Sequence, residues 1–136
     1  MTNIEGVFEC GNVLHVHDLV DFVSKEAKDA GEKAVKYLNS KEKEKNERIE
    51  IKTENGVRYV VPELIIKNND DNPLTLKLRV DNVYKKVKLE VMADDEIIIS
   101  KPRPVVAPGE METINLKPEE VLKLRNSNNI KVYLRR

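Results

Sequence analysis

The side chains best suited to chemistry in this 136-residue chain are its two histidines and its single cysteine, His15, His17 and Cys10. Because imidazole and carboxylate groups are common metal ligands, His15, His17 and the adjacent Asp18 raise the question of a metal site. Two histidines this close together on a loop leading into a helix are not expected to converge, and the sequence offers no second ligand cluster. We therefore expect no metal site, and we expect Cys10 to be a buried core thiol rather than a reactive one.

A strand followed by a helix must position these residues. Residues 6–11 form a short apolar run that ends in glycine, which predicts a strand running into a tight turn. The next segment predicts a helix with Asp18 as its N-cap, because apolar residues recur at intervals of three and four. These apolar residues are Leu19, Val20, Val23, Ala27, Ala30, Ala34, Val35 and Leu38. Because several are small, the helix is expected to pack closely against a sheet or another backbone.

The hydrophobic pattern changes from helical to strand-like near residue 48, which indicates a domain boundary. Residues 39–48 contain no apolar side chain and therefore cannot enter a core. We divide the chain into a strand–helix segment at 1–38, a charged linker at 39–48 and a mainly β domain at 49–136.

Alternating apolar residues recur throughout 49–136, as expected for strands that bury one face. They are Ile49/Ile51, Val57/Tyr59/Val61, Leu74/Leu76/Leu78/Val80, Val87/Leu89/Val91, Ile97/Ile99, Ile114/Leu116 and Ile130/Val132/Leu134. Turn-forming residues separate them at 54–56, 68–73, 94–95 and 108–109. About seven short strands at this spacing predict an immunoglobulin-like antiparallel β-sandwich without the Cys–Trp–Cys core of antibody domains. Pro62 predicts an edge strand or bulge, and residues 118–124 predict a helix.

Charge and hydropathy exclude several classes of partner. The chain has 24 basic and 24 acidic residues, so no net field favours nucleic acid or an anionic membrane. No apolar run approaches the roughly 20 residues that span a bilayer, and no signal-peptide pattern is present, so we expect a cytoplasmic protein. In the β domain, Arg58, Tyr59 and Arg79 could form a docking surface or an ordinary solvated edge.

The N-terminal segment resembles a known cofactor motif. Thr2, Gly6-Val7-Phe8 and Gly11-Asn12 are similar in order and spacing to the second FAD-contacting motif of the pyridine nucleotide-disulfide oxidoreductases, in which Gly-Asp follows Gly-Val-Phe. The resemblance implies that this corner lies beneath the ribityl chain of the flavin, with the following helix N-terminus facing the cofactor. Asn12 takes the place of the usual acid, which keeps a hydrogen-bond acceptor and removes the charge.

Residues 10–21 are more similar still to one subgroup, the FAD-dependent NAD(P) oxidoreductases with an added C-terminal domain, some of them associated with anaerobic glycerol 3-phosphate oxidation. Residues 57–62 and 108–111 look similar to that added domain. The resemblance implies five cofactor-binding residues, Gly11, Asn12, His15, Val16 and His17. It places His15 or His17 near the pyrimidine edge of the isoalloxazine, with a role in helix entry or in an interface as the alternative.

The sequence lacks the Gly-x-Gly-x-x-Gly loop that holds a dinucleotide pyrophosphate, and it lacks a Cys-x-x-Cys redox pair. We therefore expect the C-terminal part of an FAD- and NAD(P)-dependent oxidoreductase, with FAD bound in the intact parent and no cofactor or activity in the isolated chain. Its partners would be the rest of the flavoprotein and other oxidoreductase subunits, or a second copy paired through the N-terminal helix. The alternative is a freestanding immunoglobulin-like protein-binding module without redox function.

Overall fold

The computed structural model describes residues 4, 6–39, 47–67 and 72–136. The chain divides into two compact units, residues 1–45 and 46–136, which we describe separately. Thr2 of the flavin-like motif, most of the predicted charged linker and part of the predicted turn at 68–73 lie outside the described residues.

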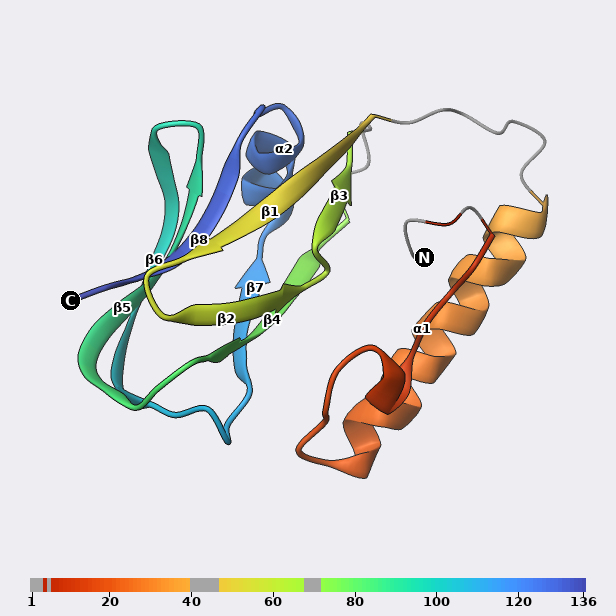
Figure 1. The fold of residues 1–136 in the computed structure, drawn as a ribbon. Coiled ribbons are helices and arrows are strands. Elements are labelled where there is room, and N and C mark those ends of the chain that lie inside the picture. Colours follow the sequence, from red (N-terminus) through yellow and green to blue (C-terminus); the bar gives the residue numbers. More distant parts are fainter. Residues whose placement is uncertain (1–3, 5, 40–46, 68–71) are drawn as a thin grey trace. The chain divides into compact units, whose positions relative to one another are not determined.

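The first unit consists of an extended segment and one long helix (Figure 1). The extended segment leads into a short 3-10 helix, η1 (Gly11–Val13), and the helix is α1 (Val20–Asn39). The segment runs antiparallel along α1. The Phe8 ring packs edge-on against Tyr37 near the end of the helix, with ring centroids 6.0 Å apart, whereas Gly11 lies next to Val23 near its start. This contact covers one stripe of α1, which comprises Val23, Glu26, Ala30, Ala34 and Tyr37.

Three details of this unit differ from the sequence prediction. The segment before Gly11 is extended but is not assigned as a strand, because no partner strand pairs with it among the described residues. The helix begins at Val20, two residues after Asp18, the residue predicted to be its N-cap. No residue of α1 is buried, and several apolar positions of the predicted stripe are exposed, namely Leu19, Val20, Val35 and Leu38. One extended segment covers only one side of a helix, which leaves these residues uncovered.

The second unit is mainly β and contains two sheets (Figure 1). The five-stranded sheet has the order β3-β1-β8-β5-β6, and the three-stranded sheet has the order β2-β4-β7. The strands are β1 (Arg48–Glu54), β2 (Val57–Val61), β3 (Leu64–Ile66), β4 (Leu74–Val80), β5 (Tyr84–Ala93), β6 (Glu96–Val106), β7 (Glu112–Leu116) and β8 (Ile130–Arg135). This arrangement confirms a mainly β fold consistent with a β-sandwich.

The strand directions correct one part of the prediction. All pairs are antiparallel except β1 with β8, which pair in parallel with Ile51 opposite Ile130. Alternating apolar residues report which face of a strand is buried but not the direction of its neighbour, so the sequence pattern could not reveal this pair. Pro62 lies between β2 and β3, where the chain passes from the edge of one sheet to the edge of the other.

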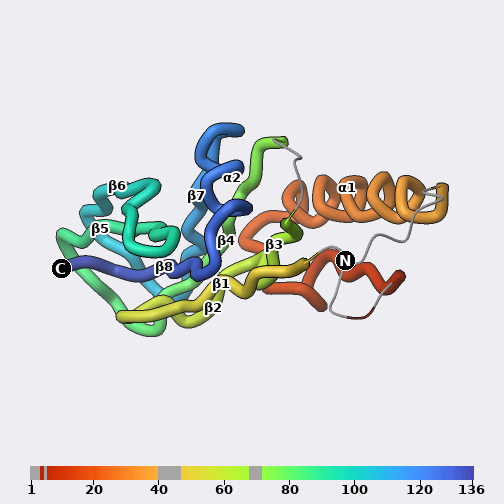
Figure 2. The backbone as a smooth tube through the Cα atoms, turned by 90° about the horizontal axis from the view of Figure 1, so that it is seen from above, coloured from red at the N-terminus to blue at the C-terminus, as the bar shows by residue number. Residues whose placement is uncertain are grey.

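Most of the predicted alternating residues lie in the core of the second unit, but in β2 the fully buried residue is Val60 rather than Tyr59 or Val61, and Ile97 is exposed. Leu76, Leu89, Ile114 and Val132, among others, are fully buried. The predicted helix is confirmed as α2 (Pro118–Arg125), which connects β7 to β8 (Figure 2). The side chain of Glu120 accepts a hydrogen bond from the backbone N–H of Lys117 at 2.6 Å and so caps the first turn. None of the described helices has the length and apolar character that crossing a membrane requires.

A buried glutamate joins three strands of the larger sheet. Glu90 of β5 is fully buried, and it lies opposite Ser100 on β6 and Tyr133 on β8. The Ser100 hydroxyl donates to one carboxylate oxygen at 2.7 Å, and the Tyr133 hydroxyl donates to the other at 2.9 Å. The half-exposed Arg135 guanidinium lies 3.4 Å from the carboxylate. The network therefore satisfies the buried charge through cross-strand neighbours.

This network predicts an alkaline limit to the stability of the sandwich. Burial, together with the hydrogen bond to Glu90, raises the pKa of Tyr133 above its usual value of about 10. Folding therefore favours the neutral phenol. The stability that this phenol contributes is complete below its pKa in the unfolded chain, and it is lost as the pH rises through its pKa in the folded protein.

We expect Tyr133→Phe to lower the free energy of unfolding by about 1–2 kcal/mol at pH 7, because a hydrogen bond to a charged group is removed. The difference from wild type should shrink above a pH of about 10, where the phenol of the unfolded wild-type chain begins to ionise. Urea unfolding of both proteins at a series of pH values measures this. A difference that stays constant into the alkaline range would contradict the assigned role of Tyr133.

Candidate functional site

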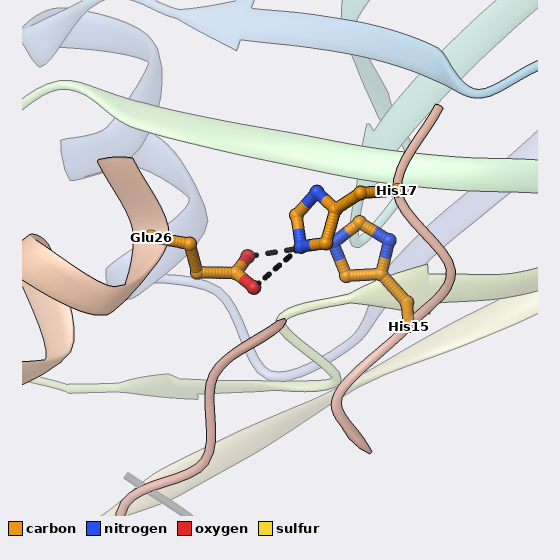
Figure 3. Close-up of side chains that lie close together, drawn as sticks. All are labelled: His15, His17 and Glu26. Atoms are coloured by element: carbon orange, nitrogen blue, oxygen red, sulfur yellow. Dashed lines mark hydrogen bonds and ion pairs between the residues drawn. The ribbon is translucent and has the colours of Figure 1, made fainter. Parts of the chain in front are cut away.

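Three ionisable side chains meet in the first unit (Figure 3). Glu26 reaches from α1 toward the loop, and His15 and His17 reach from the loop toward Glu26. Nε2 of His17 lies 2.7 Å from one carboxylate oxygen of Glu26, and Nε2 of His15 lies 3.4 Å from the other. The two imidazole centroids are 4.1 Å apart, and both rings lie beside the same carboxylate.

The turn at Gly11 makes this convergence possible. Gly11 has a φ of +71°, a conformation that favours glycine, and a Cβ built there would lie 3.4 Å from a methyl group of Val23. Its carbonyl accepts hydrogen bonds from the N–H groups of Leu14 and His15, which tightens the loop. Its own N–H donates to Glu26 at 2.9 Å. The loop therefore returns to the helix and brings alternate residues 15 and 17 to the same point.

Burial strengthens the electrostatics of this cluster. The side chains of His15 and His17 are each 1% exposed, and that of Glu26 is 13% exposed. The carboxylate only accepts, so it is the Nε2–H tautomer of an imidazole that can donate a hydrogen bond to it. Hydrogen bonds and ion pairs in such a water-poor place are stronger than at the surface.

The structure divides the five predicted cofactor-binding residues into two groups. Gly11, His15 and His17 face α1, whereas Asn12 and Val16 are exposed on the loop. The amide oxygen of Asn12 accepts a long hydrogen bond of 3.4 Å from the N–H of His17. Direct flavin contact by the five residues stays a prediction. Among the described contacts, the two imidazoles hold the loop to the helix.

Glu26 was not among the residues predicted from the sequence, and the geometry predicted for the histidines is wrong. Two histidines this close together on a loop leading into a helix were not expected to converge, whereas the Gly11 turn folds that loop onto α1. A usable signal was present in the helix. Glu26 is the acidic residue on the covered stripe that also contains Val23 and Ala30, and an acid facing a covered surface needs a partner.

Cys10 lies just before this cluster, and it is partly exposed rather than buried. It does not belong to the group of metal-binding atoms formed by His15, His17 and Glu26 within the described residues. The expectation of a fully buried thiol is therefore wrong, because the extended segment is covered by α1 on one side only.

Comparisons of the chain with protein-family models, curated proteins and solved structures found no match. The fold defines a mainly β protein with two sheets and a separate helical unit that carries the histidine cluster. Any functional assignment therefore depends on the chain's own residues.

Proposed function

We propose that the chain is part of an FAD- and NAD(P)-dependent cytoplasmic oxidoreductase, in which its N-terminal unit contributes flavin contacts and its β-sandwich is an interaction domain. The observation that supports this proposal is the Gly11 turn, which presents the side chain of Asn12 to the exterior at the point where the flavin-like motif requires a polar group.

The residues of the loop suit a flavin. Asn12 is exposed, and its amide oxygen can accept a hydrogen bond from a ribityl hydroxyl. Val13 and Val16 on the same loop are 82% and 61% exposed, so apolar surface is available for a planar ring to cover. Bound FAD would supply the redox chemistry, and the chain's residues would bind and orient it. His15 and His17 would act through the loop, which their contacts with Glu26 hold in place.

The uncovered side of α1 supports the proposal that the N-terminal unit packs against another part of a flavoprotein. Val20, Val35 and Leu38 are 78%, 57% and 80% exposed, although they belong to an amphipathic pattern that predicts burial. The chain also lacks the Gly-x-Gly-x-x-Gly strand and helix against which such a segment packs in the flavoproteins it resembles. We assign this face to the remainder of the FAD-binding domain.

The topology of the sandwich supports an immunoglobulin-like identity. β4 pairs with β7 in one sheet, and β5 pairs with β8 in the other. The connections β4 to β5 and β7 to β8 therefore both pass from one sheet to the other. The same relation holds for the B–E and C–F strands of immunoglobulin domains. Such domains commonly serve recognition, which fits docking to other oxidoreductase subunits rather than binding of nucleic acid or membrane.

One substitution tests the flavin contact. In the intact flavoprotein, Asn12→Ala should weaken FAD binding by about tenfold, because one hydrogen bond of roughly 1.5 kcal/mol is lost. Asn39→Ala, at the exposed end of α1, is the matched control and should leave the affinity unchanged. FAD dissociation constants from flavin fluorescence titration measure both. Equal affinities for wild type and Asn12→Ala would remove Asn12 from the site.

One observation favours the alternative function, a freestanding protein-binding module. The second unit contains its own complete set of core residues, including Val60, Leu78, Leu89 and Leu134. Genomic context separates the two functions. A reading frame continuous with, or adjacent to, a Gly-x-Gly-x-x-Gly strand–helix favours the oxidoreductase, and the lack of any such neighbour favours the module.

A further inference from the structure

We propose that His15, His17 and Glu26 form a zinc-binding site, with these three as its protein ligands among the described residues. The site would use Nε2 of each imidazole and one carboxylate oxygen of Glu26. The inference concerns metal binding alone and does not depend on flavin binding by the same unit.

The distances between the candidate ligand atoms support this site. Zinc is held at about 2.0–2.1 Å from nitrogen and oxygen ligands, so tetrahedral ligand atoms lie about 3.4 Å apart. Nε2 of His15 is 3.4 Å from one carboxylate oxygen of Glu26, and Nε2 of His17 is 2.7 Å from the other. One possible ligand atom from each of the three residues lies within 4.8 Å of those from the other two. Small side-chain rotations therefore suffice to admit an ion, without a change in the path of the loop.

The type of ligand selects the kind of metal. Two imidazole nitrogens favour zinc and neighbouring transition metals over magnesium or calcium, which prefer sites built from oxygen alone. Two histidines and one glutamate also form the protein ligands of several hydrolytic zinc sites, in which water or substrate takes the fourth position. Within the described part of the chain, the cluster thus supplies three protein ligands, as those sites do, and not the four of a closed structural site.

The surroundings of Glu26 favour a preformed ligand. The Gly11 N–H donates to a carboxylate oxygen at 2.9 Å, which orients the group as outer-shell partners do in metal sites. Both imidazoles are almost wholly removed from solvent, so little water has to be displaced from them. The carboxylate is 13% exposed, which gives an ion a route to the cluster.

The composition of the chain makes the experiment simple, because His15 and His17 are its only histidines. The full chain, stripped of metal with a chelator, is titrated with zinc chloride by calorimetry. We expect one ion per chain, and we expect Glu26→Gln, His15→Ala and His17→Ala each to weaken binding by about 10-fold or more. Glu26→Gln is the sharpest variant, since it keeps the shape of the side chain and an acceptor for the Gly11 N–H.

Two matched variants serve as controls. Glu32→Gln removes an exposed glutamate from the same helix, and Cys10→Ser removes the nearby thiol. Both should bind zinc as the wild type does. Far-UV circular dichroism of every variant establishes that α1 is retained. The Co²⁺ complex should show absorption of a tetrahedral site with nitrogen and oxygen ligands and no thiolate charge-transfer band.

Three outcomes would overturn the proposal. They are no zinc binding by the wild type, unchanged binding by Glu26→Gln with α1 intact, and loss of binding in Cys10→Ser. The first would leave the cluster as a purely structural set of hydrogen bonds. The second would reduce it to adventitious binding by two histidines, and the third would move the site to the thiol.

Discussion

Replacing Glu90 with alanine is expected to lower the free energy of unfolding of the sandwich by about 2–4 kcal/mol. The substitution leaves the Ser100 and Tyr133 hydroxyls without their acceptor, and it opens a cavity on β5, an interior strand of the larger sheet. The Arg135 guanidinium is half-exposed and can be solvated by water instead, so the loss of its ion pair with Glu90 adds little to the destabilisation. A decrease of this size is a large part of the stability of a small domain.

Urea unfolding of the full chain, followed by circular dichroism, measures this effect. Glu90→Gln should lower the free energy of unfolding by about half as much, because glutamine keeps the side-chain volume and one acceptor oxygen. Glu50→Ala, an exposed glutamate on β1, is the matched control and should change stability by less than about 0.5 kcal/mol. Equal stability of Glu90→Ala and wild type would show that the network contributes nothing.

The second large effect is expected at the turn between β1 and β2. Asn55 and Gly56 have φ values of +48° and +93°, left-handed values like those of type I′ turns, although β1 and β2 belong to different sheets and do not form a hairpin. A Cβ at Gly56 would lie 2.8 Å from the Tyr84 hydroxyl oxygen. That hydroxyl donates to Asp81 at 2.6 Å, and the Arg136 guanidinium lies over the same ring, so Tyr84 cannot move without losing contacts.

Gly56→Ala should therefore lower the free energy of unfolding by about 2–3 kcal/mol, from backbone strain and displacement of Tyr84 together. Gly109 provides the matched control, because no atom lies within 4 Å of a Cβ built there and its φ is not in the left-handed region. Gly109→Ala should lie between no change and a gain of about 1 kcal/mol. Thermal unfolding compares the two, and equal effects would contradict the assigned geometry.

The strands of the sandwich could be predicted from the sequence because burial on one face produces alternation. Leu74 to Val80 and Val87 to Val91 follow this pattern closely, and the Asn55-Gly56 turn follows from local chemistry alone. The parallel β1–β8 pair could not be predicted, because it joins residues far apart in the chain. The burial of Glu90 depends on its neighbours on β6 and β8, so the sequence of β5 alone does not predict this burial.

The candidate site was predictable only in part, for a similar reason. Gly11 and Asn12 were predicted through a resemblance to a local motif, and the turn predicted at Gly11 is present. The meeting of His15 and His17 with Glu26 depends on how that turn directs the loop back to α1. Distances between a loop and a helix are set by tertiary packing, and periodicity in the sequence does not encode them.

The most direct test of the proposed function is the flavin content of the protein purified by an affinity tag from the cells that produce it. We predict that it is recovered with close to one FAD per chain, together with or joined to a polypeptide that carries a Gly-x-Gly-x-x-Gly motif, as identified by mass spectrometry. Recovery of the chain from those cells without flavin and without such a polypeptide would contradict the account and favour a freestanding binding module.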